Sequence, residues 1–356
     1  MGNEVENIRK NIVTIIIQRK GACNMKALFI GGTGTISSAI SSLAIEKGVE
    51  LTLLTRSGNG PEGAERLICD VNDEDRAFSV LKGRSFDVVV DFVAFRPEQV
   101  ERDIRLFQER TGQYIFISSA STYQKPLAHP VITESTPLYN PYWQYARDKI
   151  ACETLLMAAY RSTAFPVTIV RPSHTYGDCS VPVAIHGAQG SWQVLARMLE
   201  GKPVIVHGDG LSLWTFTHNT DFARGFYGLM GNPHAIGEAV HITSDETLTW
   251  NAAFAAIGRA LGVEPILQHI SSDLLSALRP ELLGTLLGDK ANSVIFDNSK
   301  IKRLVPGFFA TVRFDEGVRR TVEYVRSHPE CQKADPEFDA WCDRVIKAYS
   351  SCVRSF

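Results

Sequence analysis

Short apolar runs alternate with amphipathic stretches through the first half of the chain. Stretches such as 98–110 and 145–160 carry apolar residues three or four positions apart and predict helices. Runs of β-branched and aromatic residues predict strands at 27–30, 50–55, 66–69, 87–92, 113–117 and 166–170. Because most of these runs are apolar throughout, we expect a parallel sheet with helices on both faces, a doubly wound α/β fold.

The pattern changes after residue 175. Residues 172–190 are rich in Gly and Pro, which is typical of a loop that faces a ligand. Later strands are expected at 204–206, 239–242 and 293–296, and helices close the chain near 315–327 and 337–350. We therefore predict a sheet-bearing domain at 25–175, to which segments from about 204–242 and 290–305 return. A smaller mixed lobe would comprise 176–203 and 243–356.

Residues 1–24 precede the first predicted strand. Their apolar run at 12–17 is far shorter than the ~20 residues that a membrane helix needs, and it lacks the cleavage site of a secretory signal. We interpret 1–24 as a peripheral leader, and we expect no membrane association.

Composition narrows the class of protein. With 356 residues, 44% hydrophobic and 21% charged, the chain has the balance of a globular protein of one or two joined domains. The formal net charge of −2 gives no electrostatic reason to expect nucleic acid or an anionic membrane as the main partner. Its seven cysteines are dispersed without a CxxC pair, which is typical of reduced thiols in a cytoplasmic protein.

The stretch 26–47 joins an apolar strand to a helix through a Gly-Gly-Thr-Gly turn at 31–34. Such a turn brings free backbone N–H groups and the positive end of a helix to one point, which suits a pyrophosphate. Gly31 would take the tight turn, and Gly34 would let the backbone approach the ligand. Ser37 stands where a third glycine is usual, which loosens the match. We expect a dinucleotide site of the Rossmann type, with an ordinary strand–helix turn as the alternative.

A serine, a tyrosine and a lysine follow predicted strands. Ser119 comes directly after the strand at 113–117, while Tyr145 and Lys149 are four residues apart and share one helix face. A tyrosine has a pKa of about 10, but a nearby ammonium and the positive ring of an oxidised nicotinamide would lower it. Tyr145 could then act as a base, with Ser119 bonded to the same substrate oxygen. Tyr142 cannot use this lysine geometry, because its fourth neighbour is an alanine.

These motifs together resemble the extended short-chain dehydrogenase/reductases of the NAD-dependent epimerase/dehydratase family. They occur in the family's order from residue 26 to about 305. The segments that carry the resemblance are Gly31-Gly32-Thr33-Gly34-Thr35-Ile36, Cys69-Asp70-Val71, Val90-Asp91-Phe92-Val93-Ala94, Ser118-Ser119 with Tyr123, Tyr145 with Lys149, Arg171-Pro172 with Tyr176-Gly177, His207-Gly208-Asp209-Gly210, Phe216-Thr217-His218 with Asp221, and Asp297 with Ser299-Lys300. The resemblance implies a Rossmann-type doubly wound parallel sheet with a smaller substrate lobe, and a homodimer formed through helices such as 98–110 and 145–160.

The resemblance also implies roles for individual residues. The catalytic residues would be Ser119, Tyr145 and Lys149. Residues expected at the cofactor are Gly31, Gly34, Thr35, Ile36, Arg56, Asp70, Val71, Phe92, Val93, Ala94, Ser118, Tyr145, Lys149, Pro172 and Ser173. Residues expected at the substrate are Ser119, Ser121, His174 and Trp214, of which His174 could also be a structural loop residue.

The end of the second predicted strand departs from the family pattern. In this family the residue at that position distinguishes NAD from NADP. It ends in Thr55-Arg56-Ser57, without the acidic residue that usually receives the adenosine ribose of NAD. Arg56 could meet the 2′-phosphate of NADP, stack on the adenine of NAD, or be a solvated turn residue. The sequence therefore leaves NAD and NADP open.

Further departures concern the reaction and the substrate. The 4,6-dehydratases that resemble this chain carry an Asp-Glu pair where Ala120 and Ser121 stand, so we do not expect that chemistry here. The nucleotide-sugar enzymes hold the diphosphate with two arginines, and those positions are Trp214 and Leu286. Trp214 could stack on a sugar or simply pack in the core. Other residues could compensate for the arginines, namely Lys290, Arg279 or His174.

Three functional hypotheses follow. The leading one is an NAD(P)-dependent sugar or nucleotide-sugar epimerase that works through a keto intermediate, with Tyr145 as general base. The alternative is a dehydrogenase or reductase of a sugar or another secondary alcohol. A third hypothesis, an RNA-binding relative that kept the fold, is opposed by the net charge of −2 and by the retention of all three catalytic residues.

Overall fold

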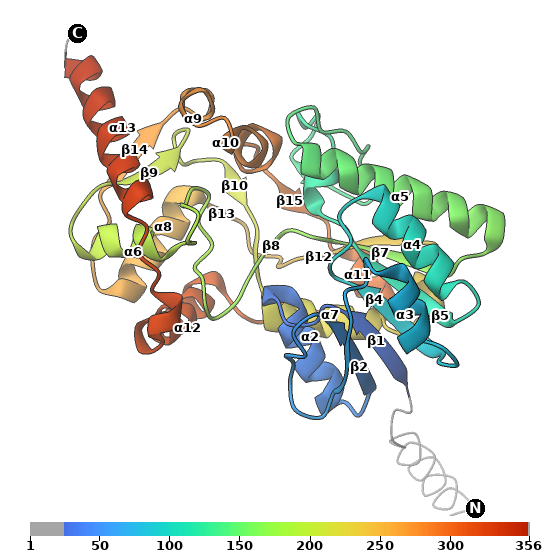
Figure 1. Ribbon diagram of the computed structural model, residues 1–356. Helices are drawn as coiled ribbons and strands as arrows, with labels where there is room; N and C mark the ends of the chain where they lie inside the picture. Colours follow the sequence, from blue (N-terminus) through green and yellow to red (C-terminus); the bar gives the residue numbers. More distant parts are fainter. Residues whose placement is uncertain (1–24, 355–356) are drawn as a thin grey trace, which may run out of the picture.

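A parallel sheet of seven strands forms the centre of the structure, a computed structural model in which residues 25–354 are described (Figure 1). The strands are β1 (Lys26–Ile30), β2 (Glu50–Thr55), β3 (Glu65–Ile68), β4 (Phe86–Asp91), β5 (Thr111–Ile117), β7 (Val167–Pro172) and β12 (Ala239–Ile242). Their order is β12-β7-β5-β4-β1-β2-β3, and all neighbours run parallel. The strand order reverses between β1 and β4, which confirms the doubly wound, Rossmann-type fold.

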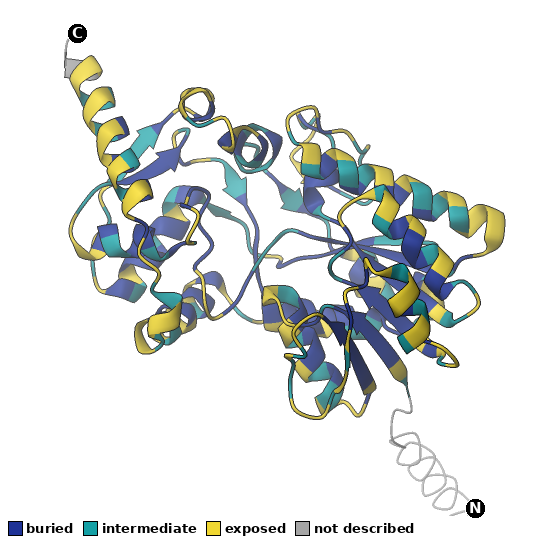
Figure 2. Cartoon of the chain, viewed as in Figure 1, coloured by how far each residue is buried: buried dark blue, intermediate teal, exposed yellow. Residues whose placement is uncertain are grey.

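Helices cover both faces of this sheet, because successive residues of a strand point to opposite sides. The helices are α2 (Thr35–Glu46), α3 (Glu74–Val80), α4 (Pro97–Phe107), α5 (Gln144–Thr163), α7 (Asn219–Leu229) and α11 (Ser299–Leu304). Phe29 of β1 packs with Ile40 of α2 on one face, where α2 also contacts α7. Leu28 packs with Leu156 of α5 on the other face, where α4 contacts α5. The strands are accordingly buried, except for the edge strand β3, and the helices expose their outer sides (Figure 2).

A second lobe lies beside the sheet, on the left of Figure 1. Its main elements are α6 (Trp192–Leu199), β9 (Val204–His207), β10 (Leu213–Trp214), β13 (Leu248–Thr249), α8 (Trp250–Leu261), β14 (Leu267–Ile270), α9 (Ser272–Leu278), α10 (Leu282–Thr285), η3 (Leu286–Lys290), α12 (Phe314–Ser327) and α13 (Pro336–Arg354). They share a core around Trp250 and Phe254. Two short parallel strands, β8 (His174–Tyr176) and β11 (Phe216–His218), pair with each other outside the main sheet.

The later strands only partly follow the prediction. β12 joins the main sheet beside β7, as expected. β9, which we expected to return to that sheet, instead pairs with β14, because its apolar side chains belong to the core of the second lobe. The short strand β15 (Ile295–Phe296) pairs with β6 (Val131–Ile132), also outside the main sheet. The domain division as a whole stays a prediction.

Four other sequence-based expectations concern the leader, membrane association, the cysteines and the oligomeric state. The proposed leader, residues 1–24, lies outside the described residues. Within 25–354, no helix is both long and apolar enough to cross a membrane. No disulfide bond joins the six cysteines in this range. The homodimer through α4 and α5 stays a prediction.

Candidate functional site

The turn after β1 has a backbone that favours glycine. Gly31 and Gly32 have φ angles of 94° and 106°, and a Cβ atom on Gly32 would lie 2.8 Å from Leu53 Cδ2. The amide of Gly34 donates a hydrogen bond of 2.9 Å to Ser37 Oγ in the first turn of α2. Ser37, the residue that loosened the sequence motif, therefore stabilises the turn. The narrow glycine turn and the N-terminus of α2 fit the pyrophosphate of a dinucleotide.

The segment after β4 continues this edge. The carboxylate of Asp91 accepts hydrogen bonds from the amides of Val93 at 2.5 Å and Ala94 at 2.7 Å. Arg102 of α4 donates to the same carboxylate at 3.2 Å and is itself buried. These contacts fix the backbone of 92–94, the residues expected to line the cofactor beside β4.

Lys149 is held beside Tyr145 on α5. Its Nζ atom donates hydrogen bonds of 2.7 Å to the carbonyl oxygens of Ala94 and Ile117, which follow β4 and end β5. The ammonium lies 5.8 Å from the centre of the Tyr145 ring. Because two backbone carbonyls fix the ammonium, the positive charge stays close to the phenol.

Ser119 also lies within hydrogen-bonding reach of Tyr145. It caps the short helix η1 (Ala120–Thr122), and its Oγ accepts from the amide of Ser121 at 3.1 Å and lies 2.9 Å from Ser121 Oγ. A hydrogen bond with Ser119 also lowers the pKa of Tyr145. The structure therefore brings together the three predicted catalytic residues, although their roles stay predictions.

Burial acts on the two titrating side chains in opposite directions. It raises the pKa of Tyr145, which the charge of Asp289 raises further while the bond with Ser119 lowers it. Burial lowers the pKa of the Lys149 ammonium to about 8. The protein alone therefore keeps the phenol protonated at neutral pH, and a bound positive ring would favour its ionisation.

A cavity of about 260 Å³ opens at Tyr145 and Ser119. Its walls come from both parts of the molecule: Ile36, Ser119, Ala120, Ser121, Lys125, Trp143, Tyr145, Pro172, Ser173, His174, Thr175, Trp214, Asp289, Lys290, Val294 and Phe296. All four residues predicted at the substrate line it, as do Pro172 and Ser173. This position, at the carboxyl ends of β5 and β7, is where ligands bind in such sheets.

Several polar atoms in the cavity walls have no hydrogen-bond partner within residues 25–354. They are His174 Nδ1, Thr175 Oγ1 and Trp214 Nε1, all shielded from solvent. Burial holds the pKa of His174 well below its ordinary value, so its ring is neutral. Buried polar atoms are normally paired, so these three are unusual in having no partner.

Other predicted cofactor residues lie outside this cavity. Arg56 and Asp70 are exposed beyond the carboxyl ends of β2 and β3, and Asp70 accepts hydrogen bonds of 3.0 Å from both the amide and the side chain of Asn72. Ser118 is buried, and its hydroxyl donates to Glu153 at 2.5 Å. That hydroxyl is therefore not available to a cofactor.

Glu153 belongs to a buried network that sequence reasoning missed. Arg171 donates to its carboxylate at 2.6 and 3.0 Å and lies 4.9 Å from the centre of the Tyr123 ring. The Tyr123 hydroxyl lies 2.9 Å from His241 Nδ1. The network fixes the end of β7 near the cavity. The only sequence signals for it were the Ser-Ser and Arg-Pro motifs, which contain Ser118 and Arg171.

The two positions without arginines differ in the structure. Trp214 lines the cavity, and its ring packs 5.8 Å from that of Trp250. Leu286 is fully buried in the core of the second lobe, so it cannot reach a ligand. Eight cavity residues were predicted neither at the cofactor nor at the substrate, although Lys290 was considered as a replacement for an arginine: Ala120, Lys125, Trp143, Thr175, Asp289, Lys290, Val294 and Phe296.

The glycine turn and the Ser119, Tyr145 and Lys149 group on a doubly wound sheet define an extended short-chain dehydrogenase/reductase. More particularly, the chain belongs to the NAD dependent epimerase/dehydratase family, whose model matches residues 27–243. The predicted class of cofactor, NAD or NADP, is thereby confirmed. This family comprises enzymes, and its curated members among the relatives include epimerases, dehydratases and a reductase.

Curated relatives have varied activities. The chain is 27% identical over 262 residues to the chloroplast stem-loop binding protein of 41 kDa b of Arabidopsis thaliana, covering 68% of this chain and 65% of the relative. It is 22% identical over 244 residues to the 2'-dehydrokanamycin reductase of Streptomyces kanamyceticus, covering 67% of each chain. It is 30% identical over 180 residues to the UDP-glucose 4-epimerase of Streptomyces lividans, covering 44% of this chain and 51% of the relative. The chain thus spans about two thirds of the first two relatives and half of the third.

Solved structures share the fold at low sequence identity. The epimerase Mth375 of Methanothermobacter thermautotrophicus superposes with a TM-score of 0.72 at 17% identity, covering 87% of this chain and 95% of that one. The UDP-glucuronic acid 4-epimerase of Bacillus cereus, solved with UDP-glucuronic acid and NAD, has a TM-score of 0.68 at 18% identity. That alignment covers 85% of this chain and 99% of the other. At these identities the similarity establishes the fold alone.

Proposed function

We propose that the protein is an NAD(P)-dependent epimerase of a sugar or nucleotide sugar. One observation carries the proposal: the side chain of Tyr145 hydrogen-bonds with Ser119 and lies near the fixed ammonium of Lys149, at a cavity with walls from both lobes. This arrangement suits the removal of a proton from a substrate hydroxyl. A bound nicotinamide dinucleotide would supply the group that accepts and returns a hydride.

The residues of the chain divide the remaining work. Tyr145 takes the hydroxyl proton as a carbonyl forms and gives it back when the carbonyl is reduced on its other face. Ser119 hydrogen-bonds the same oxygen and stabilises its developing charge. Lys149 keeps a positive charge near the phenol, which favours the phenolate. Epimerisation conserves all atoms and electrons, so no outside oxidant is required.

The residues after Ser119 argue against dehydration. Ala120 has no proton to give, and the Ser121 hydroxyl lies 2.9 Å from that of Ser119. At neutral pH a hydroxyl is a weaker general acid than the carboxyl groups that such an elimination uses. The runner-up is therefore a dehydrogenase or reductase, which needs only the cofactor and the three catalytic residues.

Cofactor choice depends on the end of β2. Arg56 is exposed there, and its side chain makes no hydrogen bond or ion pair with any residue of the described part of the chain. The side chain is therefore free to meet the 2′-phosphate of NADP. Releasing the cofactor that co-purifies with the protein and identifying it by mass spectrometry decides between NAD and NADP.

The deciding experiment follows UDP-glucose and D-glucose by NMR, without added cofactor. Formation of an epimer over many turnovers supports the proposal, whereas accumulation of reduced cofactor favours the dehydrogenase. Tyr145→Phe should abolish either reaction. Tyr142→Phe is the matched control, because Tyr142 is 37% exposed and is not part of the cavity wall.

RNA binding is a second candidate because a chloroplast stem-loop binding protein is 27% identical to this chain. The net charge of −2 opposes it, since RNA-binding surfaces are usually basic. A salt-dependent gel shift with stem-loop RNA that Tyr145→Phe retains would favour this candidate. No shift at low salt would exclude it.

A further inference from the structure

A buried lysine forms part of the substrate cavity. Lys125 is only 1% exposed, and its backbone amide donates a hydrogen bond of 2.8 Å to the carbonyl oxygen of Tyr139. Its ammonium makes no hydrogen bond and no ion pair with any residue between 25 and 354. Lysines are almost never buried without a partner, because an unpaired charge away from water is costly.

The other charges at the cavity do not neutralise Lys125. Asp289 lies 3.5 Å from the ammonium of Lys290 and pairs with it. The carboxylate of Asp289 also raises the pKa of Lys125, but burial lowers that pKa more strongly. The charged residues of the cavity wall are Asp289, Lys290 and Lys125, which together leave one net positive charge, and Lys125 is the lysine without an ion pair in the described part of the chain.

We propose that Lys125 binds an anionic group carried by the sugar itself, either a carboxylate or a phosphate ester. The proposal rests on the function proposed above and names its substrate class, an acidic sugar. A carboxylate or phosphate would give the buried ammonium the partner it lacks, through charge-assisted hydrogen bonds. The compact ammonium of a lysine suits a single anionic group at the end of a substituent.

The shape of the cavity places this group on the sugar. Lys125 shares its cavity with Ser119 and Tyr145, and about 260 Å³ is less than the ~300–1,000 Å³ typical of sites for drug-sized ligands. The family's diphosphate-binding arginines are replaced by Trp214 and by the buried Leu286. Trp214 and His174 would pack against the apolar side of the ring.

The test compares three ligands of the cofactor-loaded protein by isothermal titration calorimetry. The probes are D-glucose, which is neutral, D-glucuronate, which carries a carboxylate, and D-glucose 6-phosphate. At least one anionic probe should bind about tenfold more tightly than glucose, as expected for a hydrogen bond to a charged group. The probe that gains affinity identifies the anionic group.

Three variants test the role of each charge. Lys125→Met should remove the preference for the anionic probe and leave glucose binding nearly unchanged. Asp289→Asn should increase the preference, because it removes the negative charge that faces Lys125. Lys82→Met removes an exposed lysine and should leave every affinity unchanged. Opposite effects of Lys125→Met and Asp289→Asn cannot arise from simple misfolding.

The proposal is overturned if the wild-type protein binds neither anionic probe more tightly than glucose. It is also overturned if Asp289→Asn fails to increase the preference for the anionic probe over glucose. This second outcome can be measured even if the Lys125→Met variant does not fold. Binding is measured without turnover and can be repeated in Tyr145→Phe. The binding test can therefore succeed even if the epimerase assay fails, so the two proposals can be rejected separately.

Discussion

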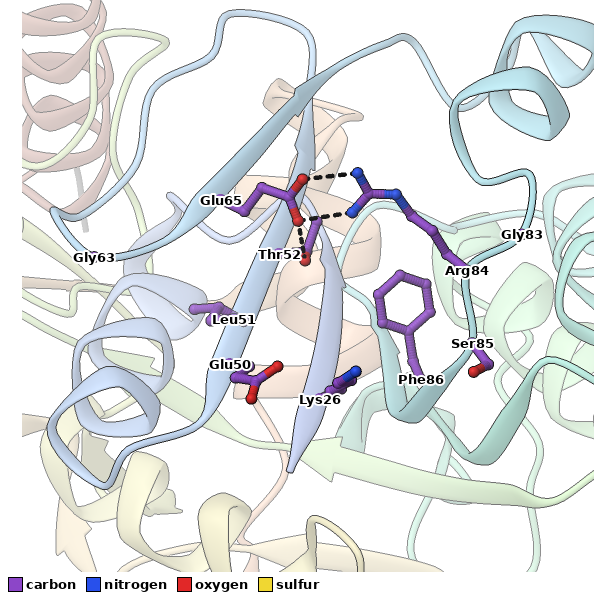
Figure 3. A pocket seen from close by; sticks show the side chains of 10 residues that line it. All are labelled: Lys26, Glu50, Leu51, Thr52, Gly63, Glu65, Gly83, Arg84, Ser85 and Phe86. Atoms are coloured by element: carbon purple, nitrogen blue, oxygen red, sulfur yellow. Dashed lines mark hydrogen bonds and ion pairs between the residues drawn. The ribbon is translucent and has the colours of Figure 1, made fainter. Parts of the chain in front are cut away.

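The sheet has one hollow at the amino ends of its strands and another at their carboxyl ends. The two hollows differ in whether their charged side chains are paired. The hollow at the amino ends of β1, β2 and β4 measures about 510 Å³. Arg84 there donates hydrogen bonds of 2.7 and 2.8 Å to Glu65, which also accepts from Thr52 at 3.0 Å (Figure 3). The cavity at the carboxyl ends is about half as large, at about 260 Å³, yet it contains an unpaired lysine and unpaired polar atoms.

Pairing is therefore a better guide to function than size in this protein. The charges of Glu65 and Arg84 already satisfy each other and need no ligand. Lys125, by contrast, lines the cavity at the carboxyl ends and has no ion pair in the described part of the chain. A ligand that pairs with its ammonium would offset the cost of burying this charge, so we place the binding site at the carboxyl ends of the strands.

Removing the phenol hydroxyl should have the largest effect. Tyr145→Phe removes the proposed base, so kcat should fall by about 10²- to 10⁴-fold. The ring remains and can keep its packing against Trp143, whose ring centre lies 4.9 Å away, so KM and the melting temperature should change little. Steady-state kinetics measure both parameters. If kcat is retained, Tyr145 is not the general base.

Adding a methyl group to the glycine turn should have the next largest effect. Gly32→Ala forces a φ of 106° on alanine and brings its Cβ to 2.8 Å from Leu53 Cδ2, so unfolding should become easier by about 1–3 kcal/mol. NAD should also stabilise this variant less than it stabilises the wild type. Urea titrations with and without NAD measure both effects.

Gly83 at the amino-edge hollow is the matched control. It has a φ of 75°, and a Cβ atom added there would meet no other side chain or backbone atom within 4 Å beyond its chain neighbours. Gly83→Ala should therefore cost only the backbone strain, about 1–2 kcal/mol, and leave stabilisation by NAD unchanged. Equal loss of NAD binding in both variants would contradict a cofactor site at the turn after β1.

Neutralising Asp289 should move the pH profile rather than abolish activity. The carboxylate raises the pKa of Tyr145, so Asp289→Asn should lower that pKa and move the limb of kcat/KM that reports Tyr145 to lower pH. The limb that reports Lys149, whose pKa is about 8, should stay in place. Profiles of kcat/KM against pH measure both limbs, and two unmoved limbs would exclude this electrostatic contact.

Local sequence patterns predicted the sheet and the catalytic group because each depends on short spacings. The apolar run of β1 and the interval between Tyr145 and Lys149 lie within single elements, and the glycine turn joins two consecutive ones, β1 and α2. Lys125 and Asp289 come from distant parts of the chain, so only the folded lobes reveal that they share a cavity. The pairing of β9 with β14 was missed for the same reason, since a short apolar run does not specify its partner.

The smallest effect should come from the amino-edge hollow. The side chains of Arg84 and Glu65 are 36% and 49% exposed, so their ion pair should contribute no more than about 1 kcal/mol. Arg84→Met should lower the free energy of unfolding by that amount at most, and kcat/KM should stay within about twofold of the wild type. Urea titration and steady-state kinetics test the two expectations. A tenfold loss of kcat/KM would mean that the larger hollow takes part in function despite its paired charges, and it would reverse the rule drawn from comparing the two edges.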